Sequence, residues 1–449
     1  MRNVLITQLA GLILFSSTLW AEMQVNTRTP YSQTYPNIAI DVEGNYVVVW
    51  RSYRQDGSSG SIHFQRFDAA GLPVGQETQV NTETAGDQTE PDVAANPDGG
   101  FVVVWHGPGP NGLDVFARLF DTNGEALAEE FRVNTTTTGT QRYPRVAMLG
   151  NGSFVVVWQN ETPGVNAYNR AGAFQVFDAQ GLCIGQETQF SESLDCRHPD
   201  VAANGMGGFV IVWMQDKGGN SIQTRLYDDA GLALTEPCKV NDVYFTSVTR
   251  PRVAMNRTGT FVVAWDGHRE YASLDDIHAR VFDPNANAIG EQFLVNTTSG
   301  GKQECPHISI SATGSFVILW DTDYKGHGKD ILGQMFDSNG VPAGPEFCPH
   351  VCLAEDQKYP AVAMSDSGSF FAVWQSYKQD GSGYGIFGML GPSSCQADFT
   401  GDALVNFRDF ALMTNLFCNG DHAPVYDINA DGRIDFSDVE MLCAHWLGR

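Results

Sequence analysis

The stretch "PDVAANPDGGFVVVW", residues 91–105, decides the fold. Pro91 precedes the short run Asp92–Ala95, and proline is tolerated at the first residue of a strand. The turn-forming residues Asn96–Gly100 follow. Phe101–Trp105 is then β-branched and aromatic without polar alternation, which is typical of a strand buried on both faces. The stretch therefore predicts two antiparallel strands joined by a tight turn.

The residues after this hairpin complete a unit of four strands. Val115–Phe120 predicts a third strand, and the turn Asp121–Gly124 leads to a fourth strand at Glu130–Val133. Asn134 closes the unit.

The unit occurs seven times along the chain, at intervals of 52 to 55 residues. Its apolar run ends at Trp50, Trp105, Trp158, Trp213, Trp265, Trp320 and Trp374. The proline before the first strand recurs as Pro36, Pro91, Pro144, Pro199, Pro251, Pro306 and Pro360. Four antiparallel strands repeated in this way are typical of a β-propeller. The alternative, a strand-rich solenoid, tends to have shorter repeats and atypical capping repeats.

The two ends of the repeat region complement each other. The seventh unit stops after its third strand, Ile386–Leu390, whereas Met23–Asn26 is a fourth strand without a unit of its own. Asn26 lies ten residues before Pro36, as Asn81 does before Pro91. The sequence therefore predicts an all-β, seven-bladed β-propeller over residues 22–391, closed by the N-terminal strand.

Composition limits the classes of partner. The chain has 449 residues, a net charge of −25 and a pI of about 4.6, which argues against nucleic acid or an anionic membrane as a partner. Residues 1–21 resemble a secretory signal, with Arg2, the apolar run Val4–Phe15 and cleavage after Ala21. The alternative, an N-terminal membrane anchor, would need a longer apolar run, and no later stretch could span a bilayer. We expect a secreted or cell-surface protein.

Nine cysteines are compatible with export, because disulfides persist outside the cytosol. Their connectivity cannot be deduced from spacing, and an odd number leaves one thiol over. None has the paired C-x-x-C spacing of a zinc site. Plausible pairs are Cys183/Cys196, Cys348/Cys352 and Cys418/Cys443.

Most of the repeated polar residues have structural explanations. An aspartate begins the turn after six of the seven third strands, where it accepts local backbone N–H bonds, and the strand tryptophans are expected to pack between blades. A glutamine three residues before the blade proline could bond loop backbone or face a ligand, and the structural role is favoured. The aspartates are Asp68, Asp121, Asp178, Asp228, Asp283 and Asp337, and the glutamines are Gln33, Gln88, Gln141, Gln303 and Gln357.

One face of the propeller is the better place for a binding site. The loops between the second and third strands and those between blades share a face, and the former vary in length and sequence, as ligand-binding loops do. The richest are Asp266–Tyr271 and Asp321–Asp330, which mix carboxylates, histidine and tyrosine. Either could contribute to a glycan-binding or hydrolytic cluster, although solvated loop charge is the favoured interpretation.

Two calcium-loop candidates, Asp398–Asp409 and Asp427–Asp438, follow a short linker at residues 392–397. Calcium takes six to eight oxygen ligands, which a twelve-residue loop supplies at fixed positions. The second loop offers Asp427, Asn429, Asp431, the Arg433 carbonyl and Asp438. The first offers Asp398, Thr400, Asp402, the Leu404 carbonyl and Asp409. The first site should be weaker because Ala403 replaces the turn glycine, at a cost of about 1 kcal/mol.

Two resemblances accompany these patterns. Residues 24–390 resemble the VNT/FVVVW repeats of large exported bacterial proteins, which implies no defined activity. Residues 398–449, with their duplicated loop, aspartate at position 12 and no helix before each loop, resemble a type I dockerin. That resemblance implies a small all-α module that holds two Ca²⁺ ions and docks a cohesin. The residues that would face the cohesin are Phe407, Arg408, Phe436 and Ser437, which differ from the Ser-Thr pair common in that family.

The expected function is that of an exported, non-catalytic binding or scaffold protein. The propeller would bind a glycan or a protein on its loop face, and the dockerin-like module would attach it to a cohesin-like partner. The alternative is a dockerin-bearing enzyme of polysaccharide catabolism, a glycoside hydrolase or lyase. No acid/base pair can be assembled from the sequence, and two carboxyls about 5–9 Å apart in a pocket on the loop face would favour hydrolysis.

Overall fold

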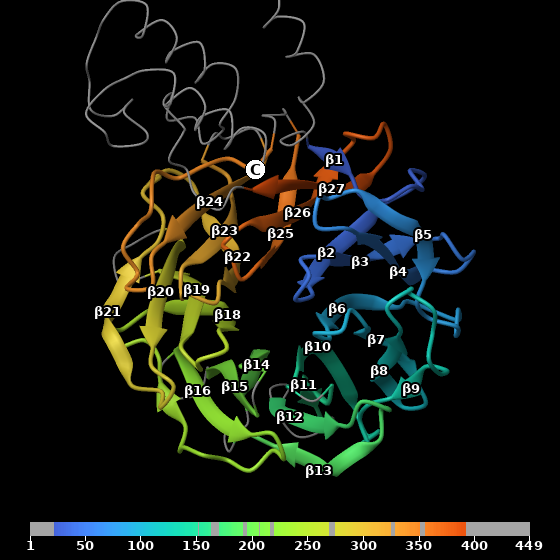
Figure 1. The fold of residues 1–449 in the computed structure, drawn as a ribbon, viewed down its shortest axis with the longest axis horizontal. Coiled ribbons are helices and arrows are strands. Elements are labelled where there is room, and N and C mark those ends of the chain that lie inside the picture. Colours follow the sequence, from blue (N-terminus) through green and yellow to red (C-terminus); the bar gives the residue numbers. More distant parts are fainter. Residues whose placement is uncertain are drawn as a thin grey trace, which may run out of the picture.

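The computed structural model describes residues 22–391, apart from 151, 163–169, 192–194, 206, 216–219, 269–273, 325–327 and 351–354. These residues form a β-propeller of seven blades around a central axis (Figure 1). Cavities lined by the innermost strands follow this axis, and we call them the central channel. The leader at residues 1–21 and the calcium-loop module at 398–449 lie outside the described residues. The metal ligands and the cohesin-facing residues therefore stay predictions. Within the described residues, no helix has the length and apolar character needed to cross a membrane.

Each blade is an antiparallel sheet whose first strand lies innermost. The first blade contains β2 (Gln33–Ile40), β3 (Tyr46–Tyr53), β4 (Gly60–Phe67) and β5 (Pro73–Gln79). The second contains β6 (Thr89–Ala95), β7 (Phe101–Gly109), β8 (Gly112–Phe120) and β9 (Phe131–Arg132). The third contains β10 (Thr140–Met148), β11 (Phe154–Glu161), β12 (Arg170–Phe177) and β13 (Cys183–Gln189). The fourth contains β14 (Cys196–Ala203), β15 (Gly208–Gln215), β16 (Ser221–Asp228) and β17 (Cys238–Lys239).

The remaining blades follow the same order. The fifth contains β18 (Ser247–Met255), β19 (Phe261–His268), β20 (Asp276–Phe282) and β21 (Ala288–Leu294). The sixth contains β22 (Gln303–Ile310), β23 (Phe316–Thr322) and β24 (Asp330–Phe336). Its expected fourth strand is reduced to an isolated bridge between Gly333 and Phe347. The seventh contains β25 (Gln357–Met364), β26 (Phe370–Tyr377), β27 (Tyr384–Gly391) and, from the other end of the chain, β1 (Met23–Gln24).

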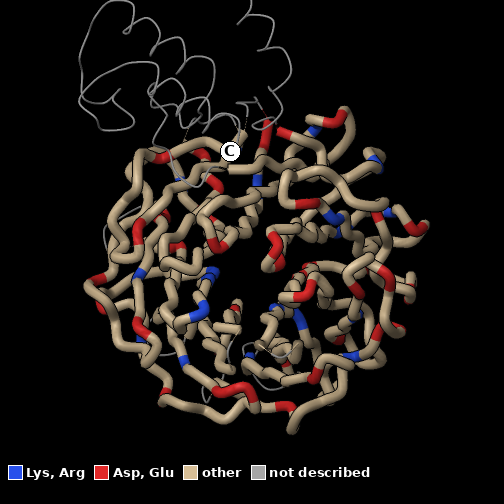
Figure 2. Tube along the Cα trace, in the orientation of Figure 1, with Lys and Arg blue, Asp and Glu red and all other residues tan. Residues whose placement is uncertain are grey.

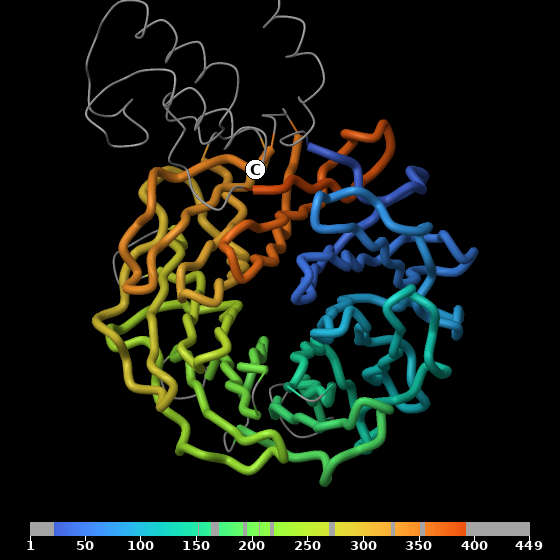
Figure 3. Tube along the Cα trace, in the orientation of Figure 1, coloured from blue at the N-terminus to red at the C-terminus, as the bar shows by residue number. Residues whose placement is uncertain are grey.

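The N-terminal strand closes the ring, as the sequence predicts. Met23 pairs with Gly388 and Gln24 with Phe387 in an antiparallel ladder. The N–H of Val25 then donates to the Ile386 carbonyl at 2.8 Å. In Figure 3 the blue start of the described chain and its orange end lie side by side in this blade. The first and last blades are consequently not free to separate without breaking a sheet.

The hydrophobic core is divided among the blade interfaces. The second strand of each blade has covered faces because neighbouring blades pack on both sides, which explains its lack of polar alternation. Val48 and Trp50 of the first blade, for example, pack with Val25 and Val373 of the seventh. All seven strand tryptophans are at most 2% exposed, so they are packing residues and form no sugar-stacking platform.

The repeated aspartates and glutamines have the structural roles expected of them. Asp68 Oδ1 accepts the N–H groups of Ala70 and Leu72 at 3.0 and 2.8 Å, and the five equivalent aspartates do the same. Gln33 Nε2 donates to the Pro30 carbonyl at 3.2 Å, and Gln88, Gln141 and Gln303 bond the carbonyl three residues before them. These glutamines hold the loops that connect one blade to the next.

The expected disulfide between Cys183 and Cys196 is wrong, because both residues are free thiols. Cys183 begins β13 beside a turn on one face of the propeller, whereas Cys196 is buried at the start of β14 on the opposite face. The seven residues of β13 separate the two positions by about 20 Å along the blade. The proposed partners Cys352, Cys418 and Cys443 lie outside the described residues.

Candidate functional site

A bulge interrupts the innermost strand of every blade at the same place. The pairing between the first and second strands skips two residues there, for instance between Thr34 and Asn37. The second residue skipped is the blade proline, and the residue before it has a positive φ of 46° to 56° in all seven blades. These residues are Tyr35, Glu90, Tyr143, His198, Arg250, Cys305 and Tyr359.

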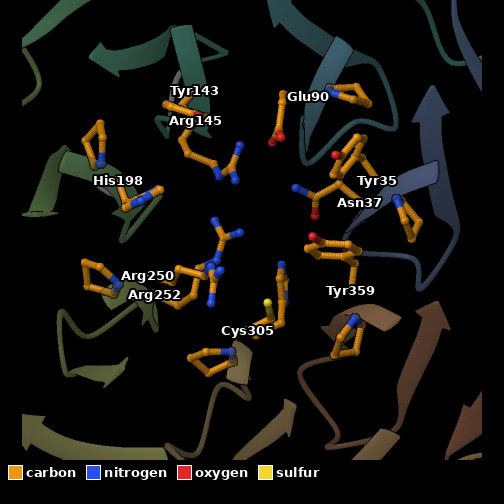
Figure 4. A pocket seen from close by; sticks show the side chains of 17 residues that line it. Tyr35, Asn37, Glu90, Tyr143, Arg145, His198, Arg250, Arg252, Cys305 and Tyr359 are labelled. Carbon is orange, nitrogen blue, oxygen red and sulfur yellow. The ribbon is translucent and has the colours of Figure 1, made fainter. Parts of the chain in front are cut away.

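A left-handed backbone costs a residue with a side chain roughly 1–2 kcal/mol. The same positive φ is found in all seven blades in spite of this cost, so the bulge is a regular feature of the fold. It has a consequence for the site, because the seven side chains before the prolines line one cavity at the mouth of the channel (Figure 4).

The cavity has a volume of about 300 Å³. Besides the seven residues before the prolines, six of the prolines (all but Pro144) and four residues after the prolines line it: Asn37, Arg145, Arg252 and His307. All of these lie at the start of the innermost strands, where the loops between blades enter. The cavity therefore opens on the loop face that the sequence favours, but the innermost strands supply its walls.

Three arginines form one side of the cavity, which we call the cationic wall: Arg145 on β10 with Arg250 and Arg252 on β18. Their guanidinium groups point toward the channel axis (Figure 4). Arg145 Nε and Arg252 Nη1 lie 3.9 and 3.7 Å from the same oxygen, Oδ1 of Asp200. Arg250 Nη1 lies 3.5 Å from Oδ2 of Asp266. Two guanidiniums thus share a single carboxylate.

The opposite side of the cavity carries hydroxyl, amide and carboxylate groups, and we call it the hydroxyl wall: Tyr35, Asn37, Glu90 and Tyr359 (Figure 4). The rings of Tyr35 and Tyr359 lie 5.3 Å apart between their centroids. Burial raises the pKa of both phenols, that of Tyr359 to about 12. Both tyrosines therefore remain protonated at neutral pH and can donate as well as accept hydrogen bonds.

Two histidines beside the cationic wall are uncharged. Burial, followed by the nearby arginines, lowers the pKa of His198 to about 3 and that of His307 well below its usual range. His307 Nδ1 accepts the N–H of Val362 at 3.2 Å, so it holds the seventh blade against the sixth. Neither imidazole adds positive charge to the cavity at neutral pH.

In three blades, the residue after the strand tryptophan supports the bulge of the following blade. Gln375 accepts the N–H of Tyr35 at 3.1 Å, Gln159 that of His198 at 3.4 Å, and Asp321 that of Tyr359 at 3.4 Å. Side chains of one blade therefore fix the backbone of the next at the rim of the cavity.

The sequence favours solvated charge for the loops Asp266–Tyr271 and Asp321–Asp330, and this interpretation is wrong for the first residue of each loop. Asp266 and Asp321 are 2% and 1% exposed, because each continues a buried second strand toward the channel. Asp266 contacts Thr249 and Arg250, and burial raises its pKa to about 7. Asp321 accepts a bond from Lys329 Nζ at 2.9 Å. Residues 269–273 and 325–327 of these loops lie outside the described residues.

Sequence reasoning missed the residues that line the cavity. One feature of the sequence could have indicated them. The blade proline recurs in every unit, whereas the residues on either side of it differ in chemical type from unit to unit. The residue before it is Tyr, Glu, Tyr, His, Arg, Cys or Tyr, and the residue after it is Asn, Asp, Arg, Asp, Arg, His or Ala. Only the bulge, which alternation along a strand does not predict, turns both neighbours toward one cavity.

Carboxylates are few in the described lining of the cavity. Among the described residues that line the cavity, Glu90 is the one carboxylic acid. Across the described part of the chain, no group of three or more His, Cys, Asp or Glu side chains is placed to hold a metal ion. The cavity therefore offers a polar, cationic binding surface.

No family model and no curated protein matches the chain. Among solved structures, an ulvan lyase from a new family of polysaccharide lyases is 9% identical, covers 84% of this chain and 96% of its own, and gives a TM-score of 0.50. A protein of unknown function from Dyadobacter fermentans is 12% identical over 82% of this chain and 97% of its own, with a TM-score of 0.47. The β-propeller domain of the trilobed protease from Pyrococcus furiosus is 9% identical over 81% and 94%, with a TM-score of 0.47. At these identities the likeness to the lyase shows the propeller fold alone.

Proposed function

We propose that the chain is an exported glycan-binding protein. The mouth of the propeller channel takes the sugar, and the C-terminal module binds calcium and attaches the protein to a cohesin-like partner. The observation that supports the first part is the convergence of tyrosine hydroxyls, the Glu90 carboxylate and arginine donors on one cavity of about 300 Å³. Ligand pockets combine apolar and aromatic walls with well-placed polar groups. In this cavity the prolines and tyrosine rings supply the apolar part, and the polar groups are more numerous.

The enzyme alternative, a glycoside hydrolase or lyase, has less support. Glycoside hydrolysis commonly uses two carboxyls, and Glu90 is the one acid in the described lining. A general base works best with a pKa near the working pH, whereas the pKa of His198 is about 3 and that of Tyr359 about 12. Propellers of this fold include a polysaccharide lyase, but a shared fold does not fix activity.

Glycan-array binding by the full chain tests the proposal. We expect binding to a subset of glycans, and about a fivefold loss of affinity for each hydrogen bond removed by Glu90→Gln or Tyr359→Phe. Glu43→Gln, an exposed carboxylate on the opposite face, is the matched control and should bind as the unmodified chain does. Absence of glycan binding, or binding unaffected by both cavity variants, would overturn the proposal. New reducing ends or unsaturated sugar products would favour the enzyme alternative.

Calorimetric titration with Ca²⁺ tests the C-terminal module. The double variant Asp427→Ala and Asp438→Ala removes two charged ligands and should abolish the tighter binding event. Ala403→Gly should strengthen the weaker event, because glycine adopts the turn conformation without strain. Asp98→Ala, in a propeller turn, is the control and should leave both events unchanged. A titration without heat, or one that the double variant does not alter, would contradict the calcium proposal.

A further inference from the structure

The geometry points to a more specific ligand: an acidic sugar whose carboxylate or sulfate oxyanion binds between Arg145 and Arg252. The inference rests on the proposed function in taking the ligand to be a sugar. The oxyanion site itself rests on the side chains of the channel mouth, and the two parts can fail separately.

Arg145 and Arg252 hold equivalent positions, directly after the prolines of the third and fifth blades. Both reach over the fourth blade toward Asp200, yet the distances of 3.9 and 3.7 Å exceed those of a hydrogen bond. Arg145 Nη1 donates to the Pro144 carbonyl at 2.7 Å, while its buried Nε has no hydrogen-bond partner among the described residues. A guanidinium has five donors, so these two retain donors directed at the channel.

The neighbouring carboxylates are committed to the backbone. Asp200 Oδ2 accepts the N–H of Val253 at 2.9 Å. Asp92 Oδ2 accepts the N–H of Val146 at 2.8 Å, and its Oδ1 accepts the side-chain amide of Asn37. With the bond from the Val362 N–H to His307, these backbone bonds join the second blade to the third, the fourth to the fifth and the sixth to the seventh. Asp200 is the carboxylate nearest to both arginines, and Asp92 and Glu90 offset a further part of their charge from a greater distance.

The electrostatic environment favours a further negative charge. Burial and repulsion by Arg145 lower the pKa of Arg252, and both arginines help to lower the pKa of His198 and His307. An oxyanion between the guanidiniums would relieve that repulsion and form charge-assisted bonds, which arginine often makes in pairs. The three arginines lie together in a chain with a net charge of −25, and blue and red segments both border the central opening in Figure 2.

The side chains of the hydroxyl wall favour a ligand whose remaining part is uncharged and carries hydroxyl groups. The hydroxyls of Tyr35 and Tyr359 face Arg250 and Arg252 across the cavity, and Glu90 lies at the edge of the hydroxyl wall beside Arg145 (Figure 4). A carboxylate there accepts bonds from sugar hydroxyls and repels a second anionic group. The volume of about 300 Å³ is at the small end for ligand sites, which typically run to ~1,000 Å³. The cavity thus fits one sugar unit with an anionic end and a hydroxylated body.

Isothermal titration calorimetry on the full chain tests this inference with four probes. They are a glucuronate-terminated oligosaccharide, a sulfated oligosaccharide, their neutral counterpart and inorganic sulfate. At least one acidic oligosaccharide should bind tighter than the neutral one by a factor of ten or more. Arg145→Gln and Arg252→Gln should each lower the affinity for the acidic oligosaccharide roughly 10- to 100-fold, as expected for the loss of a bond to a charged group. The affinity for the neutral oligosaccharide should change less than about twofold.

The control is Arg257→Gln, an arginine of the opposite face that pairs with Asp366 and is 55% exposed, and it should change nothing. If Arg145→Gln does not fold, Arg145→Lys takes its place. Lysine keeps the charge without the planar fork, so this variant should give an intermediate loss of affinity. Equal binding of acidic and neutral sugars, or equal weakening of both by the arginine variants, overturns the oxyanion assignment and leaves glycan binding standing. Arginine-dependent binding of inorganic sulfate without any sugar supports the oxyanion site and overturns glycan binding. Binding of no probe overturns both.

Discussion

At the residue scale, one asparagine fastens the outermost strand of a blade to the strand beside it. Asn241 Oδ1 accepts the buried N–H of Ile222 at 2.8 Å, and its Nδ2 donates to the Val243 carbonyl. The same bond recurs in four other blades. Ser191 and His350 replace the asparagine in the remaining two and accept the equivalent N–H. The asparagine is visible in the sequence as part of a V-N-T triplet in four blades and of V-N-D at Asn241, but its bonding partner is not.

The loss of stability on replacing this asparagine should therefore depend on whether the new side chain still offers a hydrogen-bond acceptor. Asn241→Ala leaves the N–H of Ile222 buried and unpaired, which should lower the free energy of unfolding by about 1–3 kcal/mol. Asn241→Ser keeps an oxygen, as Ser191 does in the third blade, and should cost less than the alanine variant. Urea denaturation of both variants measures the difference. Equal losses would mean that the acceptor contributes nothing.

Asp266 should make the stability of the protein depend on pH. Burial raises its pKa from 3.8 to about 7, so between these values the folded state binds more protons at this site than the unfolded state. Its contribution to stability is therefore lost as the pH rises from about 4 to 7, by up to about 4 kcal/mol. Asp266→Asn keeps the shape of the protonated acid and removes the titration.

The difference in unfolding free energy between Asp266→Asn and the unmodified chain isolates this effect from other groups. The variant should be close to the unmodified chain at pH 4 and become progressively more stable than it toward pH 8. Chemical denaturation across that range measures the difference. A variant that is destabilised more at pH 8 than at pH 4 would show that the ion pair with Arg250 outweighs the cost of burial.

At the scale of the element, two features differ in how far the sequence predicts them. The closing strand β1 was predictable because Asn26 keeps the spacing of the other asparagines to the blade proline. Thr27 of the same triplet also bonds Glu77 of the first blade, through its N–H at 2.6 Å and its hydroxyl at 2.7 Å. The bulge in the innermost strands was not predictable, since proline at a strand start is compatible with a regular ladder. The cavity, which depends on the bulge, was missed with it.

The closure predicts that Val25 contributes to stability as an internal residue does. Val25 and Val133 hold the same position in their blades, are 2% and 1% exposed, and each donates its N–H to the third strand at 2.8 Å. Only Val133 is joined to its blade through the chain on its N-terminal side. Val25→Ala and Val133→Ala should each lower the free energy of unfolding by about 2 kcal/mol.

Thermal and urea denaturation of the two alanine variants make the comparison. A frayed N-terminal strand would leave Val25→Ala indistinguishable from the unmodified chain while Val133→Ala is destabilised. Deletion of residues 22–26 should lower the melting temperature further, because it removes the whole closing strand.

At the scale of the whole molecule, the repeated units made the fold predictable from the sequence but gave no indication of the site. Seven equal units predict the number of blades, their order and the face on which variable loops gather. The site depends on what differs between units at two positions beside each proline, and those differences carry meaning only once the ring brings Glu90, Arg145 and Arg252 to one cavity. The buried positions of Asp266 and Asp321 were likewise hidden, because a strand that continues past its tryptophan looks like a polar loop in the sequence.

The most direct test of the account is a structure of the full chain bound to the acidic oligosaccharide selected by calorimetry. The account predicts one sugar unit in the channel mouth, with its carboxylate or sulfate between Arg145 and Arg252 and its hydroxyls toward Glu90 and Tyr359. A sugar bound on the opposite face or outside the blades, with the channel mouth unchanged, would contradict it.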